Sequence, residues 1–160
     1  MSPDLYRLMK EALEEAKKGF AEGEVPVGAV LSGLDGQILA KAHNQPISQN
    51  DPTAHAEILA IRRAGLVCRN YRLNNTLLIT TIEPCLMCMG AAINARMTRL
   101  VFGAPDPKAG AVSAFNDIGA DKRFNHRLEV ISGIMEEECR ALMQDFFRIR
   151  RGKDRWQNNI

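Results

Sequence analysis

The stretch TLLITTIEPCLMC constrains the fold more than any other part of the chain. Residues 76–82 form a continuous apolar run rich in β-branched side chains, which is typical of a strand buried on both faces of a sheet. Glu83 and Pro84 end this strand, and an apolar segment of helical length follows over about residues 85–96. A buried strand that leads directly into a helix indicates a sheet with helices packed against it.

The rest of the chain continues this alternation of strands and helices. The pattern predicts a helix over residues 4–20, then a hairpin from VPVGAVLS and QILAKAH, then a polar loop in NQPISQNDPT. A second helix is expected from Ala54 to about Ala64, capped by Thr53 and ended by Gly65. After the strand over residues 76–82 and its helix, we expect strands in RLVFGA and RLEVISG with a Gly/Pro-rich loop between them, and a last helix over residues 135–151. No repeat or linker interrupts this order. It predicts one domain over residues 1–160, an α/β fold built as a three-layer α/β/α sandwich around a mixed five-stranded sheet.

Composition narrows the class of protein. With 46% hydrophobic and 25% charged residues, the chain is typical of a globular domain. No apolar run approaches the roughly 18–20 residues that span a bilayer, and the acid-containing N-terminal helix is unlike a signal peptide. We therefore expect a cytoplasmic location without a membrane partner. Four cysteines in 160 residues are too few for a disulfide scaffold, so we expect reduced thiols.

The pair Cys85 and Cys88 is compatible with three kinds of site. It could be a thioredoxin-like redox pair, which also lies at a strand-to-helix junction. It could be half of a structural zinc site, but such a site needs a second Cys/His pair. Cys68 and Cys139 do not form one, because each lies in an apolar pattern and is expected in the core. The third possibility is a catalytic zinc site with one ligand still to be found.

That ligand occurs in DPTAHAEI, where His55 and Glu57 open the preceding helix. Three ligands, His55, Cys85 and Cys88, leave one tetrahedral position open, which distinguishes a catalytic zinc from a structural one. A water there is acidified toward hydroxide, and Glu57 is placed to carry its protons. A lone His-x-Glu is usually an ordinary histidine beside a solvated glutamate. Followed by Pro-Cys-x-x-Cys about 30 residues later, it is the signature of the zinc-dependent nucleobase deaminases.

Nearly the whole chain resembles the bacterial tRNA-specific adenosine deaminases of the cytidine/deoxycytidylate deaminase superfamily. The resemblance is carried by EVPVGAV, HNQPI, DPTAHAEI, NYRL, EPCLMCMGA, VFGAPDPKAGA, NHRLEV and FFRIRR. The zinc motif alone fits many purine and pyrimidine deaminases. The segments NHRLEV and FFRIRR point to the tRNA enzymes in particular.

The resemblance implies a hydrolase that acts on a cyclic amidine C–N bond. It implies hydrolytic deamination of adenosine to inosine at the wobble position of a tRNA, with arginine tRNA expected, by a homodimer that binds the anticodon loop. It also implies one zinc per subunit, held by His55, Cys85 and Cys88, with Glu57 as the proton shuttle. The base pocket would be lined by residues around Asn44, Ala56 and Pro84, and Asp106 would lie beside the anticodon backbone. From the residues alone, Asn44 and Asp106 could equally be turn residues next to prolines.

The C-terminal end adds a separate indication of an RNA partner. Residues 140–155 hold six basic and two acidic side chains, a net charge of +4, whereas the whole chain carries only +2. Arg148 beside Phe146 and Phe147 could combine phosphate contacts with base stacking. Alternatively, one or both phenylalanines pack in the core, and the basic run is a solvated tail.

Two other functions remain open at this point. A free-base deaminase for guanine or cytosine would use the same zinc site without needing a basic surface. A non-catalytic, zinc-stabilised RNA-binding module would need the metal and the basic surface but not Glu57.

Overall fold

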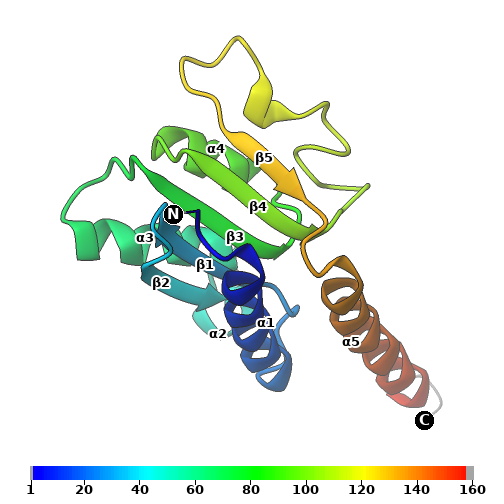
Figure 1. Ribbon diagram of the computed structural model, residues 1–160. Coiled ribbons are helices and arrows are strands. Elements are labelled where there is room, and N and C mark those ends of the chain that lie inside the picture. Colours follow the sequence, from blue (N-terminus) through cyan, green and yellow to red (C-terminus); the bar gives the residue numbers. More distant parts are fainter. Residues whose placement is uncertain (1, 158–160) are drawn as a thin grey trace.

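A mixed sheet of five strands lies between two helical layers in the computed structural model of the chain (Figure 1). The structure describes residues 2–157, with side chains for residues 2–153. The strands are β1 (Gly28–Gly33), β2 (Ile38–His43), β3 (Thr76–Ile82), β4 (Arg99–Ala104) and β5 (Glu129–Ser132), in the sheet order β2-β1-β3-β4-β5. β1 is antiparallel to β2 and β3, whereas β3, β4 and β5 are parallel. The predicted three-layer α/β/α architecture is confirmed.

The helices divide between the two faces of the sheet. They are α1 (Leu5–Ala21), α2 (Pro46–Gln49), α3 (Ala56–Cys68), α4 (Leu86–Asn94), the 3-10 turn η1 (Ile118–Ala120) and α5 (Glu136–Gln157). α1 and α5 cover one face, where α5 contacts β3, β4 and α1, and α3 and α4 cover the other. None of the described helices is both long and apolar enough to cross a membrane.

The apolar run of β3 is explained by the two cores on either side of it. Leu78 packs into the core beneath α3 and α4, whereas Leu77 and Ile79 pack into the core beneath α1 and α5. All three side chains are fully buried. A strand with two buried faces has no reason to alternate polar and apolar residues, which is why its bounds could be predicted to the residue.

The start and end of α3 differ from the prediction. Thr53 does not cap the helix, because its N–H and hydroxyl both donate to Asp51, at 2.8 and 2.7 Å. His55 takes the N-cap position, and the helix passes Gly65 to end where Arg69 adopts a left-handed backbone with φ 49°. The loop predicted in NQPISQNDPT also contains the short helix α2.

The two cysteines outside the Cys-x-x-Cys pair have different environments. Cys139 lies in the core beneath α5, as predicted. Cys68 is exposed at the end of α3, so its predicted place in the core is wrong. The apolar pattern around it continues into Leu66 and Val67, which are themselves 80% and 63% exposed.

We predict that Gly28→Ala destabilises the fold. A Cβ at Gly28 would lie 1.8 Å from the backbone oxygen of Ala12, so α1 would have to move away from β1. We expect a loss of at least about 2 kcal/mol in the free energy of unfolding, measured by urea denaturation. Gly90→Ala is the matched control, since no described atom lies within 4 Å of its Cβ position apart from its chain neighbours and the nearby backbone of its own helix. Equal stability of the two variants would contradict this packing.

An ionic cluster around the buried Glu15 ties the end of β2 to α1. The His43 ring contacts the Glu15 carboxylate at 3.1 Å through Nδ1 and Glu22 at 2.9 Å through Nε2, and Lys18 donates to Glu15 at 2.6 Å. Burial by itself would raise the pKa of Glu15, but the hydrogen bonds from Lys18 and His43 outweigh it and lower that pKa below its ordinary value of 4.5. His43 therefore faces α1 and has a structural role.

This cluster predicts a pH-dependent effect of Glu15→Gln. Because the folded pKa of Glu15 is lowered, its ionised form stabilises the fold fully above pH 4.5, and this contribution is lost as the pH falls through the folded pKa. Urea unfolding should show the variant about 1–2 kcal/mol less stable than the wild type at neutral pH. The difference should shrink in acid. A difference that stays constant down to the lowest pH at which the protein folds would contradict the assignment.

Candidate metal centre

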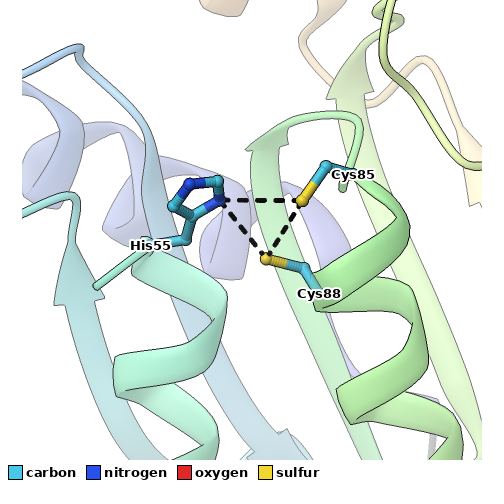
Figure 2. A group of neighbouring side chains, drawn as sticks. All are labelled: His55, Cys85 and Cys88. Atoms are coloured by element: carbon cyan, nitrogen blue, oxygen red, sulfur yellow. Dashed lines mark hydrogen bonds between the residues drawn. The ribbon is translucent and has the colours of Figure 1, made fainter. Parts of the chain in front are cut away.

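Three potential metal ligands come from the starts of two helices. His55 is the N-cap of α3 and Cys85 is the N-cap of α4, and Cys88 follows in the first turn of α4. Neither N-cap side chain makes a capping hydrogen bond to the backbone of its own helix, so both can turn toward each other. Figure 2 shows the imidazole of His55 facing the two sulfurs across the space between the helices.

The distances among these three side chains match the corners of a tetrahedron around zinc. His55 Nδ1 lies 3.7 Å from Cys85 Sγ and 3.5 Å from Cys88 Sγ, and the two sulfurs are 3.8 Å apart. Ideal tetrahedral bonds to zinc place two sulfurs about 3.8 Å apart, and a sulfur and a nitrogen about 3.6 Å apart. The residues present therefore fit a zinc ion, and the three of them form the predicted ligand set.

The electrostatics of the site favour a thiolate. The contact with Cys88 is the main cause that lowers the pKa of Cys85, and His55 adds to it. The same contact and burial raise the pKa of Cys88. The contact with Cys85 raises the pKa of His55. Without metal, one negative charge is thus placed on Cys85 at the positive end of α4, and a divalent cation would stabilise the second thiolate as well.

Glu57 lies in the first turn of α3 and is almost completely buried, with 3% of its surface exposed. Its Oε2 makes no hydrogen bond to any residue that the structure describes. Burial raises the pKa of its carboxyl to about 7. A buried carboxyl with an unsatisfied oxygen costs stability, which indicates that the oxygen has a partner from outside the chain.

A cavity of about 680 Å³ opens beside the candidate ligands. Its walls come from several distant parts of the chain. They include Asn44, His55, Glu57, Glu83 and Cys85 around the metal centre, residues 104–109 at and after the end of β4, and Arg140, Met143, Gln144 and Phe147 on α5. The volume lies in the range of ordinary small-ligand sites.

Asn44 and Asp106 both line this cavity, as the substrate roles implied for them require. The Asn44 Oδ1 accepts a hydrogen bond from the Ala56 N–H at 2.8 Å, and no described residue accepts one from its amino group. Asp106 Oδ1 accepts from the N–H groups of Lys108 and Ala109, at 3.0 and 3.1 Å. One oxygen of Asp106 therefore serves a turn, which was the alternative that the sequence left open.

Ala56 and Pro84 use their backbone groups inside the chain. The Ala56 N–H donates to Asn44, and the Pro84 carbonyl accepts from the Ala111 N–H at 2.9 Å. Both residues are buried. Their contact with the base stays a prediction, and their observed role is to hold Asn44 and the start of α4 in place.

The two phenylalanines of α5 have separate roles. Phe146 is buried and packs edge-on against Phe20 of α1, with ring centroids 5.5 Å apart, so the substrate contact predicted for it is replaced by core packing. Phe147 is 39% exposed and lines the cavity. Arg148 is exposed and forms an ion pair of 3.0 Å with Asp145. The side chain of Arg155, which the charge count included, lies outside the described residues.

Sequence reasoning missed Glu83 as a residue of the site. It was interpreted only as the residue that ends β3, yet its buried carboxylate lines the cavity. A polar residue directly between a buried strand and a metal ligand is an available signal. Its hydrogen-bond partners come from an irregular loop more than twenty residues later, which no periodicity predicts.

Comparison with known proteins gives a consistent result. Residues 2–104 match the family model described as the cytidine and deoxycytidylate deaminase zinc-binding region. The chain is 45% identical to the tRNA-specific adenosine deaminase of Bacillus subtilis (strain 168), over 98% of this chain and 96% of that protein. It is 48% identical to the protein of the same name from Haemophilus influenzae, over 91% of this chain and 84% of that protein.

A solved structure shares the fold. It comes from a study of A-to-I editing by tRNA:A34 deaminases at the wobble position of transfer RNA. It is 40% identical to this chain and superposes with a TM-score of 0.81, over 85% of this chain and 98% of that one.

We predict that metal content depends on Cys88 and not on Cys68. Elemental analysis of the purified wild type should give about one zinc per chain. Cys88→Ser should lose most of it, because a serine hydroxyl is a much weaker zinc ligand than a thiolate and only two strong ligands remain. The variant should also unfold at lower temperature, as should the wild type after chelation. Cys68→Ser changes an exposed thiol outside the site and should keep its zinc. Full zinc in Cys88→Ser would contradict the ligand assignment.

Proposed function

The chain belongs to the cytidine and deoxycytidylate deaminase family, and on that premise we propose that it converts adenosine to inosine at the wobble position of a tRNA. The reaction consumes water and releases ammonia. One observation carries the proposal more than any other: the buried Oε2 of Glu57, which has no partner among the described residues, lies in the same cavity as the three candidate metal ligands. A metal site with an open position and a buried carboxyl beside it suit hydrolysis.

The chemistry requires that a proton moves twice. His55, Cys85 and Cys88 would hold a zinc ion, which would supply the Lewis acid that activates water for attack on C6 of the base. Glu57 takes a proton from the attacking water and delivers one to the ring nitrogen. As the C6–N6 bond breaks, Glu57 takes the second proton from the new C6 hydroxyl and passes it to the departing amine, which leaves as ammonia. A carboxyl whose pKa is raised to about 7 by burial can serve both steps near neutral pH.

Other residues of the cavity are suited to hold the nucleoside. Asn44 is anchored through its carbonyl oxygen, which leaves its amino group to donate to the substrate. Phe147 offers a partly exposed ring at the cavity wall, on which a base can stack. Asp106, on the loop that follows β4, can contact the sugar of the target nucleotide or of a flanking nucleotide.

The outer surface of α5 suits the rest of the RNA. Arg148, Arg150, Arg151 and Lys153 are all exposed along this helix, which continues away from Phe147 and the cavity. Positive side chains in line with a base-binding cavity fit the phosphates of a loop whose target base is turned out of its stack.

The choice of tRNA, the oligomeric state and the location in the cell are proposed from the resemblance to the tRNA-specific adenosine deaminases. We propose arginine tRNA as the substrate, a homodimer as the active form and the cytoplasm as the location. Exposed apolar side chains support the dimer, since Leu66 and Val67 at the end of α3 and Tyr71 just after it are 80%, 63% and 76% exposed and suit a surface that a second copy covers.

The test is to incubate the zinc-loaded protein with arginine tRNA and analyse the nucleosides. We expect inosine with the wild type and a loss of about 10²–10⁴-fold in rate with Glu57→Gln, because the proton carrier is removed. Zinc content and tRNA affinity of Glu57→Gln should stay near the wild-type values. Glu14→Gln, an exposed glutamate on α1, is the control and should retain full activity.

Contrary results would separate the alternatives. Deamination of free guanine or cytosine without inosine in tRNA would identify a free-base deaminase, whose turnover should also be nearly independent of salt. Zinc and tRNA binding without any turnover would identify a binding module. Full activity in Glu57→Gln would remove Glu57 from the chemistry.

A further inference from the structure

Glu83 is a buried carboxylate that the proposed chemistry does not use. It lies between the end of β3 and the ligand Cys85, and only 4% of its surface is exposed. Oε1 accepts hydrogen bonds from the N–H groups of Val112 and Ser113, at 2.8 and 2.6 Å. Oε2 accepts from the Asp106 N–H at 2.8 Å and from the Ser113 hydroxyl at 2.7 Å. These four bonds use the full accepting capacity of a carboxylate.

All four donors belong to one loop, residues 105–113, that follows β4. The first half of this loop, residues 105–109, forms a wall of the substrate cavity. The second half is also held to the metal-ligand segment, since Ala111 N–H donates to the Pro84 carbonyl and Gly110 forms a β-bridge with Cys85. The carboxylate therefore lies at the junction between the cavity wall and a metal ligand.

The loop is shaped around the carboxylate. A Cβ at Gly110 would lie 2.2–2.5 Å from the carboxyl atoms of Glu83, so only glycine admits this side chain. Burying a carboxylate is costly unless its oxygens are satisfied, and apolar packing at such a position is often as stable or more so. The arrangement is therefore better explained by a need to hold this loop in one place than by stability alone.

We propose that Glu83 is a positioning residue that fixes the substrate-facing loop, including Asp106 and Lys108, relative to the metal ligand Cys85. With the loop fixed in advance, the tRNA does not have to order this wall of the cavity when it binds. The proposal rests on the proposed function, because it concerns the binding of that same substrate. It assigns Glu83 to binding through the loop and not to the proton transfers.

The first variant is Glu83→Gln in the zinc-loaded protein. An amide nitrogen cannot accept the Asp106 N–H, whereas the Ser113 hydroxyl can turn to accept from the amide, so the wall next to the cavity is released first. We expect KM for the tRNA to rise about ten- to hundredfold, with zinc content unchanged and a much smaller change in kcat. Hydrogen exchange of the amides of Asp106, Val112 and Ser113 should become faster.

Gly110→Ala provides an independent second variant. Its methyl group displaces the carboxylate of Glu83 without removing it, so it should raise KM to a similar degree. The double variant Glu83→Ala/Gly110→Ala should be no worse than Gly110→Ala alone, because both changes break the same contact. If Glu83→Gln does not fold, the comparison of Gly110→Ala with the double variant still decides the question.

Glu15→Gln is the matched control, because it alters a buried carboxylate that lies away from the cavity. It should lose stability and keep the KM of the wild type. The proposal is overturned if Glu83→Gln behaves in the same way, or if its loop amides exchange faster while KM stays unchanged. Absence of inosine with the wild type would instead refute the proposed function, and the exchange measurement would still report on the contact between Glu83 and the loop.

Discussion

The meeting of two helix N-termini is the constraint on which the rest of this structure depends. α3 leads back into β3 and α4 leads out of it, both on the same face of the sheet, so both helices begin at the carboxyl end of β3. The N-cap residues His55 and Cys85 make no capping hydrogen bond and face each other instead. The sheet therefore brings together ligands thirty residues apart at distances that suit a tetrahedral ion.

Two buried carboxylates beside this centre have different roles. Glu57 has an oxygen without a partner among the described residues, whereas Glu83 accepts four hydrogen bonds from a single loop. Glu57 can exchange protons because one of its oxygens is free of such a bond to any described residue, whereas Glu83 is held in place by its four hydrogen bonds. Both lie on the same cavity, so the fold supplies a proton carrier and a fixed wall within one site.

The sequence predicted those parts of the structure that depend on local pattern. β3 and β4 were predicted to the residue because apolar runs with clear breakers define them, and the ligand set followed from helical spacing and from the count of donors. The burial of Phe146 and the exposure of Cys68 depend on which turn of a helix meets the neighbouring helix. The role of Glu83 depends on an irregular loop. Such contacts between distant segments leave no periodic signal in the chain.

The central claim is that three protein ligands hold one zinc and leave a coordination position for a group from outside the chain. X-ray absorption at the zinc edge of the purified protein tests it most directly. The account predicts a first shell of two sulfurs at about 2.3 Å, one imidazole nitrogen and one further light atom. A shell with three or four sulfurs, or two imidazoles, would contradict it, because the open position would then be closed by protein.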